Sequence, residues 1–298
     1  MRNKIFIGAA TALYTPFTNG AVNINALKEA IERQIEGKID ALVILGTTGE
    51  CPTVEESERF EIIKTTVSQV RKRVPVIVGC GSNDTKTYVK RLKTAKDLGA
   101  DAALAVTPYY NKCSDDGLFK HYEAGDKLGF PTIVYNVPSR TGVNIKPETY
   151  EKLIGLDSIR GIKEASCDMN HIKKVFEKVG DKIPVYSGSD ELNYEFFSLG
   201  ASGTISVLSN VIPEKIHDYF CNFKTNYKYE NLRYNTLMKK LANLLFSSIN
   251  PIPLKSLVKK YYKKGYELRL PLCELPEEES EKLYVEFESV LHNLEEKK

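Results

Sequence analysis

Lys163 is the residue whose type and position point most directly to chemistry. It directly follows a short apolar run, 159–162, that has the composition of a buried strand. A lysine at such a strand end can be desolvated, which lowers the pKa of its amine and makes it a nucleophile toward a carbonyl carbon. A solvated lysine, or one paired with Glu164, is the alternative for Lys163 taken alone. The residues at the other predicted strand ends favour the nucleophile.

Hydroxyl groups follow two of these predicted strands. Tyr135 ends the run 132–135, and its phenol could move protons to and from the hydroxyl on the carbon that becomes an imine. Thr47 and Thr48 lie in a turn bracketed by glycines, where hydroxyls and backbone N–H groups can hold a carboxylate. The alternatives are a tyrosine that caps the core and a plain turn before a helix.

Arg140 lies shortly after Tyr135 and could clamp a second carboxylate through two parallel N–H groups. A loop salt bridge is its alternative, and the pair Tyr109–Tyr110 could serve only packing. The histidines lie in predicted helices, away from strand ends: His121, His171, His217 and His292. This set of residues favours covalent amine catalysis over a metal-dependent aldol reaction.

The elements that must position these residues alternate along the chain. Short apolar runs, typical of strands covered on both faces, occupy 7–13, 41–45, 74–78, 102–106, 132–135, 159–162, 185–186 and 203–207. Amphipathic helical patterns separate them, for example over 26–36, 55–70 and 85–98. Eight strand–helix units predict an α/β fold, a (β/α)8 TIM barrel, whose active site lies at the carboxyl ends of the strands. No G-x-G-x-x-G follows a strand, so a dinucleotide fold lacks its fingerprint.

The pattern changes after Val211. The segment 213–294 shows no convincing strand and is too long for the last barrel helix alone. We therefore expect a barrel over residues 1–212 and a small helical C-terminal region over 213–298 that packs on it and includes the last barrel helix.

Composition limits the class of protein. Among 298 residues, 42 Lys and Arg face 39 Asp and Glu, which gives no polybasic signal for nucleic acid. The basic stretch 255–264 is expected to be a solvated helix face. Six cysteines without C-x-x-C spacing favour reduced thiols in the cytoplasm, and no apolar run reaches membrane-spanning length. We expect no nucleic-acid and no membrane partner.

Several motifs in order along the chain together resemble a known family. They are Thr11–Phe17, Gly46–Glu50 (GTTGE), Thr107–Tyr110 (TPYY), Tyr135–Gly142 (YNVPSRTG), Ile162–Ala165 (IKEA), Ser187–Asp190 (SGSD) and Asn250–Lys255 (NPIPLK). The sequence resembles the dihydrodipicolinate synthase family, within the N-acetylneuraminate lyase group of class I aldolases. The lysine and the tyrosine are shared by the whole group, whereas Thr47–Thr48, Tyr109–Tyr110 and Arg140 resemble the synthase branch.

The resemblance implies roles for individual residues. Lys163 forms an imine with pyruvate, Tyr135 transfers protons, and Thr48 helps to bind the pyruvate carboxylate. Thr47, Tyr135 and Tyr110 form a proton relay, with Tyr110 contributed by a neighbouring subunit. The resemblance further implies that Arg140 binds the carboxylate of aspartate semialdehyde, while backbone groups of Gly188 and Ile205 line the site.

The product implied is 4-hydroxytetrahydrodipicolinate, in diaminopimelate and lysine biosynthesis. No metal or organic cofactor is expected, and the family implies a homotetramer built as a dimer of dimers. The rival activity is that of a sister aldolase that cleaves N-acetylneuraminate or a 2-keto-3-deoxy sugar acid. Arg140 and the Thr47–Thr48 pair favour the synthase over that rival.

One departure concerns feedback inhibition by lysine. Inhibited members of the family carry a histidine where this chain has Glu56, and an acid where it has Thr87. Arg59 is a second basic position, and Asn83 and Tyr109 match the inhibitor site. We therefore expect weak inhibition by lysine or none.

Overall fold

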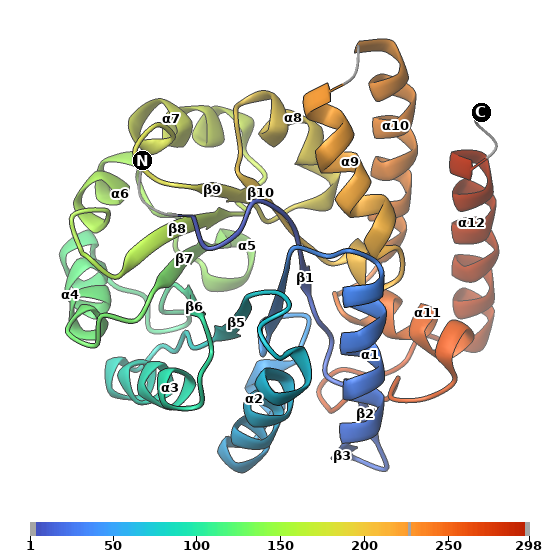
Figure 1. The fold of residues 1–298 in the computed structure, drawn as a ribbon, viewed down its shortest axis with the longest axis horizontal. Coiled ribbons are helices and arrows are strands. Elements are labelled where there is room, and N and C mark those ends of the chain that lie inside the picture. The colour runs from blue at the N-terminus through green and yellow to red at the C-terminus, as the bar shows by residue number, and fades with distance from the viewer. Residues whose placement is uncertain (1–3, 226–227, 296–298) are drawn as a thin grey trace.

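A closed ring of eight parallel strands forms the centre of the computed structural model, which describes residues 4–225 and 228–295 (Figure 1). In ring order the strands are β1 (Gly8–Ala12), β4 (Ala41–Ile44), β5 (Val76–Gly79), β6 (Ala102–Val106), β7 (Thr132–Asn136), β8 (Ile159–Glu164), β9 (Val185–Ser187) and β10 (Gly203–Ser206), and β10 pairs with β1. Each of these strands coincides with one of the apolar runs in the sequence. The predicted TIM barrel is confirmed.

Side chains of the strands alternate between the inside of the barrel and the helices around it. The inside is filled by a separate apolar cluster that includes Val43, Ile77, Leu104 and Ile205. At the amino-terminal end of the strands, Tyr186 stacks on Phe6 with ring centroids 4.3 Å apart and donates a hydrogen bond to its carbonyl oxygen. That end of the barrel is closed by apolar packing, which leaves the carboxyl ends for polar groups.

Helices cover the outside of the ring. They are α1 (Ile24–Glu36), α2 (Glu56–Val70), α3 (Thr85–Asp97), α4 (Asp115–Asp126), α6 (Pro147–Leu153), α7 (Met169–Val179), α8 (Asn193–Ser198) and α9 (Pro213–Thr225), with the one-turn α5 (Pro138–Thr141) before α6. Asn23, Asp84 and Ser114 precede α1, α3 and α4, and their side-chain oxygens accept hydrogen bonds from backbone N–H groups of the first turn. These capping residues fix where the helices begin.

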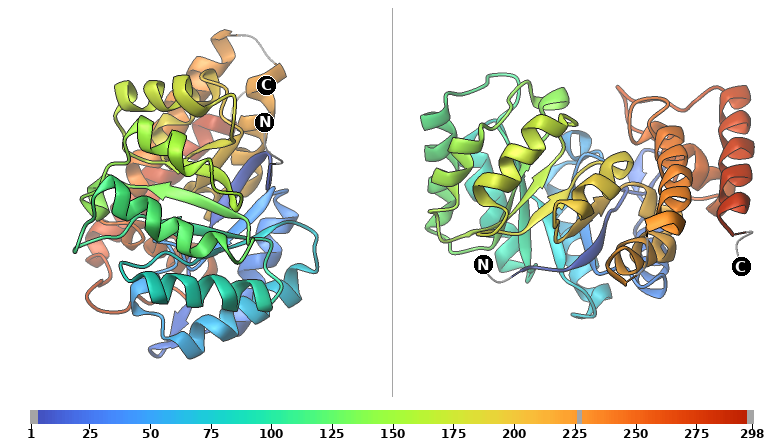
Figure 2. Two further views of the ribbon diagram at one scale, coloured as in Figure 1. Left: turned by 90° about the vertical axis from the view of Figure 1, so that its left-hand side faces the viewer. Right: turned by 90° about the horizontal axis from the view of Figure 1, so that it is seen from above.

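The described residues after α9 hold three further helices: α10 (Lys228–Leu245), α11 (Ile252–Tyr262) and α12 (Glu277–Glu295). Both α10 and α11 pack against α12, and the three lie together on one side of the barrel (Figures 1 and 2). Helix α9 follows β10 and packs against β1, so it takes the place of the last barrel helix. The division of the chain into two units at residue 213 stays a prediction.

Two features differ from the sequence prediction. A short antiparallel pair, β2 (Phe17–Thr18) and β3 (Ala21–Val22), was not predicted, because two-residue strands are too short to show a period. The basic stretch 255–264 is not uniformly solvated, since Lys255 is buried while Lys259 and Lys260 form ion pairs at the surface. The expectation of a solvated helix face was wrong for Lys255.

Candidate active site

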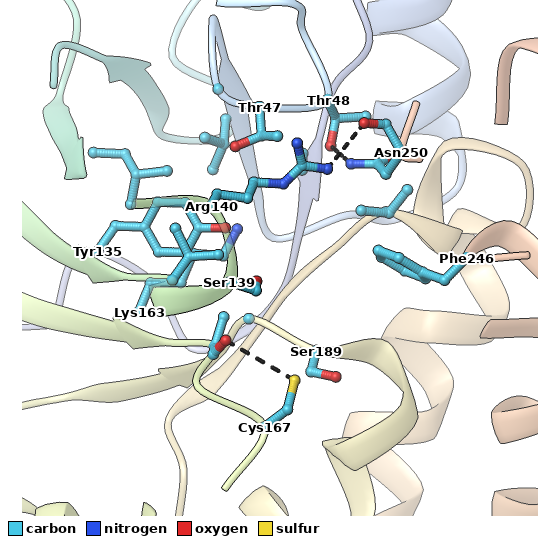
Figure 3. A pocket seen from close by; sticks show the side chains of 18 of the residues that line it. Thr47, Thr48, Tyr135, Ser139, Arg140, Lys163, Cys167, Ser189, Phe246 and Asn250 are labelled. Carbon is cyan, nitrogen blue, oxygen red and sulfur yellow. Dashed lines mark hydrogen bonds between the residues drawn. The ribbon is translucent and has the colours of Figure 1, made fainter. Parts of the chain in front are cut away.

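Lys163 and Tyr135 face each other on neighbouring strands at the carboxyl end of the barrel. They are paired in the β7–β8 register, and the Lys163 Nζ lies 4.3 Å from the centroid of the Tyr135 ring (Figure 3). Lys163 is 5% exposed, and its amine has no hydrogen-bond acceptor or carboxylate in contact among the residues that the structure describes. It is a buried amine whose nitrogen is not engaged by the protein.

Burial sets the protonation of this pair. It lowers the pKa of the Lys163 amine to about 8, with the Asp190 carboxylate acting in the opposite direction and the Arg140 charge adding to the decrease. Burial also raises the pKa of Tyr135 to about 12, against the Arg140 charge and a hydrogen bond with the Thr47 side chain. Near neutral pH the phenol is protonated, and a fraction of Lys163 is neutral amine.

The two side chains line a pocket of about 240 Å³. Of the predicted site residues, Lys163, Tyr135, Thr47, Thr48, Arg140 and Gly188 all line it. The walls also include side chains that the sequence analysis did not assign, among them Ser139, Cys167, Ser189, Glu191, Val207, Phe246 and Asn250. The structure therefore brings together most of the predicted site residues, and it shows further residues that complete the walls of the pocket.

The turn after β4 carries Thr47 and Thr48. It rests directly on β5, because Gly79 has no side chain: a Cβ there would lie 1.9 Å from the carbonyl oxygen of Leu45. Glu50 ends the turn with a left-handed backbone (φ 51°). Thr48 is buried, and its Oγ1 accepts a hydrogen bond of 3.1 Å from the Asn250 Nδ2.

Arg140 extends into the pocket from α5, although much of its side chain is exposed. Pro138 begins this short helix, and Gly142 ends it with a left-handed backbone (φ 68°). The Arg140 Nη2 donates a hydrogen bond of 3.0 Å to the carbonyl oxygen of Asn250. Figure 3 shows Arg140 reaching between the Tyr135–Lys163 pair and Asn250.

Gly188 leaves room for the lysine side chain. A Cβ at Gly188 would lie 2.7 Å from the Ala165 Cβ and 3.0 Å from the Lys163 Cε. Its backbone N–H donates to the carbonyl oxygen of Glu164, which ties the loop after β9 to β8. A glycine at this point lets the lysine chain lie against the backbone.

Two predicted residues are placed elsewhere. Tyr110 is 93% exposed in the loop after β6 and does not line the pocket of this chain. Ile205 is buried inside the barrel, paired with Ala10 of β1, and Val207 lines the pocket in its place. The predicted contribution of the Ile205 backbone stays a prediction.

Two buried carboxylates hold the strand ends in place. The Asp190 Oδ2 accepts hydrogen bonds from the backbone N–H groups of Val207 and Leu208, which joins the loops after β9 and β10. Glu164 accepts from the Asn136 side chain and from the Tyr150 hydroxyl on the outer side of the barrel. Both carboxylates are occupied by structural hydrogen bonds rather than by Lys163.

Asn250 reaches the pocket from the C-terminal region, in the connection between α10 and α11. It is 202 residues from Thr48 and 110 residues from Arg140 in the chain, and contacts both. In the sequence, Asn250 belongs to the NPIPLK motif, from which no role was predicted for it. The motif was the available signal; the contact itself depends on where α10 and α11 pack.

A second contact joins the same two segments. The buried Glu50 carboxylate lies 2.5 Å from the Lys255 Nζ, and the Lys255 amine also donates to the carbonyl oxygen of Glu267. The other oxygen of Glu50 accepts from the backbone N–H of Arg269. We refer to these four residues as the Glu50–Lys255 junction.

The described residues also bear on two other kinds of site, a metal site and a membrane span. Within 4–225 and 228–295, no group of three or more His, Cys, Asp and Glu side chains is arranged to hold a metal ion. The predicted helical positions of the histidines are confirmed, on α4, α7, α9 and α12. None of the helices in the described part of the chain is long and apolar enough to span a membrane.

A TIM barrel with a buried, unpaired amine at a strand end and a phenol beside it defines a class of enzymes, those that form Schiff bases with carbonyl substrates. Comparison with known proteins narrows the class. The chain belongs to the dihydrodipicolinate synthetase family, whose sequence model matches residues 5–289.

Individual relatives cover nearly the whole chain. A 4-hydroxy-tetrahydrodipicolinate synthase of Clostridium acetobutylicum is 45% identical over 279 residues, which is 92% of this chain and 94% of that protein. The crystal structure of dihydrodipicolinate synthase from Thermotoga maritima is 36% identical with a TM-score of 0.93, covering 96% of this chain and 99% of that one. The enzyme from Acinetobacter baumannii, solved as a complex with pyruvate, is 37% identical with a TM-score of 0.90, over 95% and 98% of the two chains.

Proposed function

We propose that this chain is a lyase that condenses pyruvate with aspartate semialdehyde to give 4-hydroxytetrahydrodipicolinate. The observation that carries this proposal is the buried Lys163 amine, which has no hydrogen-bond acceptor among the described residues and lies 4.3 Å from the Tyr135 ring. A buried amine without a partner is available to a substrate carbonyl. The family and its named relatives support the same activity.

The chemistry uses the protonated imine of Lys163 as an electron sink. Neutral Lys163 attacks the C2 carbonyl of pyruvate, and loss of water leaves a protonated imine. The positive charge acidifies the methyl group, and loss of a proton gives an enamine. The enamine carbon attacks the aldehyde carbon of the second substrate and forms a C–C bond. The amine of that substrate then displaces Lys163 and closes the ring, which restores the free enzyme.

Tyr135 is the proton carrier of these steps. Its phenol, protonated at neutral pH and next to Lys163, donates a proton to the hydroxyl that leaves as water and takes one back later. Thr47 is hydrogen-bonded with Tyr135 and continues the relay. Tyr110 completes it from a neighbouring subunit, in keeping with its exposed position on this chain. This proposal requires an oligomer, for which we propose a tetramer built as a dimer of dimers.

The carboxylates of the two substrates bind at different places. Thr48 binds that of pyruvate, next to the imine, together with backbone groups of Gly188 and Ile205. Arg140 binds that of aspartate semialdehyde from the open side of the pocket. No metal or organic cofactor has a part in these steps. A cytoplasmic location stays a prediction.

Trapping with borohydride tests the mechanism. With pyruvate present, reduction is expected to leave a three-carbon adduct on Lys163, identified by peptide mapping. An adduct on another lysine, or no adduct, would contradict the proposal.

A substrate comparison tests the specificity. Pyruvate with aspartate semialdehyde is expected to turn over, and pyruvate with N-acetylmannosamine is not. The converse result would identify the chain as a sister aldolase, which the named relatives do not favour.

A further inference from the structure

We infer that Asn250 is a positioning residue that aims the hydroxyl hydrogen of Thr48 at the carboxylate of the imine-forming substrate. This inference rests on the proposed function, because it needs Thr48 to bind that carboxylate. The juxtaposition that carries it is a side-chain amide from the C-terminal region seated against the Thr48 hydroxyl at the wall of the pocket (Figure 3).

The direction of this hydrogen bond determines what the hydroxyl does. The Asn250 Nδ2 donates and the Thr48 Oγ1 accepts, at 3.1 Å. An oxygen that accepts from an amide keeps its own hydrogen for another acceptor, and accepting one bond strengthens the bond that it donates. In the described residues no acceptor contacts that hydrogen, while Thr48 lines the pocket beside Lys163. The substrate carboxylate is therefore the acceptor.

The backbone of Asn250 is fixed at the pocket wall. Asn250 is 5% exposed, and its backbone carbonyl oxygen accepts a hydrogen bond from the Arg140 Nη2, while its side-chain Oδ1 is buried without a hydrogen-bond partner among the described residues. Asn250 thereby contacts both residues that we assign to substrate carboxylates. The Asn250 side chain contacts Thr48, and the Asn250 backbone contacts Arg140. A substitution at Asn250 therefore alters the contact with Thr48 and keeps the backbone contact with Arg140.

The Glu50–Lys255 junction fixes the spacing of the two segments. Glu50 lies two residues after Thr48, and Lys255 lies five residues after Asn250. The ion pair of 2.5 Å between them is buried on both sides. The turn after β4 and the start of α11 are thus joined at two points, which limits the ways in which the amide and the hydroxyl can shift relative to each other.

Two substitutions distinguish aiming from simple packing. Asn250→Ala removes the donor and leaves the hydroxyl free to rotate. Asn250→Asp has nearly the same shape, but its carboxylate accepts from Thr48, turns the hydrogen away from the pocket and adds a negative charge near the substrate carboxylate. The added charge alone would also weaken binding of the substrate carboxylate, so the effect of each substitution is compared with and without the Thr48 hydroxyl.

The measurement is the pyruvate concentration that gives half-maximal borohydride adduct on Lys163, without the second substrate. We expect it to rise about tenfold for Asn250→Ala, as for one lost hydrogen bond, and about a hundredfold for Asn250→Asp. The KM for aspartate semialdehyde in Asn250→Ala should stay within about threefold of wild type, because the backbone contact with Arg140 remains. Asn243→Asp, an exposed asparagine on α10, makes the same charge change away from the pocket and is the control.

A double-mutant cycle completes the test. In a Thr48→Val background, Asn250→Ala should raise the half-maximal pyruvate concentration by less than about twofold, since there is no hydroxyl left to aim. Equal effects of Asn250→Ala in both backgrounds, or an Asp variant no worse than the Ala variant, would overturn the inference. If Asn250→Ala does not fold, Asn250→Asp in the wild-type and Thr48→Val backgrounds decides, and an equal effect in the two backgrounds overturns the inference. Absence of any adduct in the wild type would instead refute the proposed function.

Discussion

Two lysines are buried in the described part of the chain, and they occupy different regions with different consequences. Burial lowers the pKa of Lys163 and of Lys255 to about 8 in each case. Lys255 lies 2.5 Å from the Glu50 carboxylate and donates to a carbonyl oxygen, whereas Lys163 faces a tyrosine ring and an open pocket. Burial and a lowered pKa are common to both lysines, so the proposed nucleophile is distinguished by its nitrogen, which has no hydrogen-bond or ion-pair partner among the described residues.

The largest expected effect separates the two lysines by activity. Lys163→Met should abolish the pyruvate adduct and lower kcat by at least about 10³-fold, because among the described residues no other lysine lines the pocket. The folded state should remain, since no ion pair is broken. Steady-state kinetics and thermal unfolding on the same preparation check both statements. Residual adduct in this variant would mean that Lys255 or another lysine can replace it.

Lys255→Met should have the opposite profile. Removing one partner of a buried ion pair leaves Glu50 uncompensated and is expected to lower the free energy of unfolding by roughly 3–5 kcal/mol. Urea denaturation measures it, and borohydride should still label Lys163 in the folded fraction. The double variant Lys255→Met/Glu50→Leu should regain much of the lost stability. A stable Lys255→Met protein without an adduct would break the distinction between the two regions.

Arg140 sharpens the comparison from the side of the pocket. Arg140→Ala should weaken use of aspartate semialdehyde by roughly 2–5 kcal/mol in kcat/KM while leaving the Lys163 adduct with pyruvate largely intact. Arg140→Lys keeps the charge but loses the planar guanidinium, and it is the matched control. Its kcat/KM for aspartate semialdehyde should lie between those of the wild type and Arg140→Ala. An unchanged kcat/KM for the aldehyde substrate would remove Arg140 from the site.

The pH dependence tests the protonation of Lys163 directly. Only the neutral amine attacks a carbonyl, so the rate of adduct formation should rise about tenfold for each pH unit below about 8 and level off above it. Timed borohydride quenching between pH 6 and pH 9 gives the profile. A rate that rises without a plateau toward pH 10 would show that Lys163 behaves as a solvated lysine.

The smallest expected effect is that of added lysine on activity, and it concerns a third buried cation, Arg59. Arg59 is buried, and its guanidinium donates to the carbonyl oxygen of Gly79, while Glu56 forms an ion pair with Arg91 at 2.8 Å. The family resemblance relates Glu56 and Arg59 to the site for an inhibitory lysine, and Glu56 already has a cation as its partner. Lysine should therefore inhibit weakly or not at all. An inhibition titration with half-inhibition well below the millimolar range would contradict this prediction.

The sequence was sufficient to predict the part of the site that the barrel itself builds. Lys163 and Tyr135 follow apolar runs, and parallel pairing of neighbouring strands places the ends of those runs side by side. The local turn chemistry likewise indicated Thr47 and Thr48. Each of these residues is positioned by elements close to it in the chain or next to it in the ladder.

The sequence was insufficient for the part assembled from distant segments. Asn250 and Lys255 meet the turn after β4 only because α10 and α11 pack on one side of the barrel. A helical pattern in sequence does not say which face of the barrel it covers. Lys255 was predicted to be solvated for that reason. It was grouped with four nearby lysines, and the sequence pattern did not indicate that it alone is buried. The four are Lys259, Lys260, Lys263 and Lys264.

The placement of Asn250 bears on how far this protein could be shortened. A chain cut after α9 would still contain every strand of the ring, the lysine and the tyrosine, and would look like a minimal enzyme. It would lack the amide that contacts Thr48 and the cation that neutralises Glu50, so that one cut would open the pocket wall and strand a carboxylate in the interior. The helices after α9 should therefore be kept in any shortened version of the protein. The smallest working version of this catalyst includes them at least through α11.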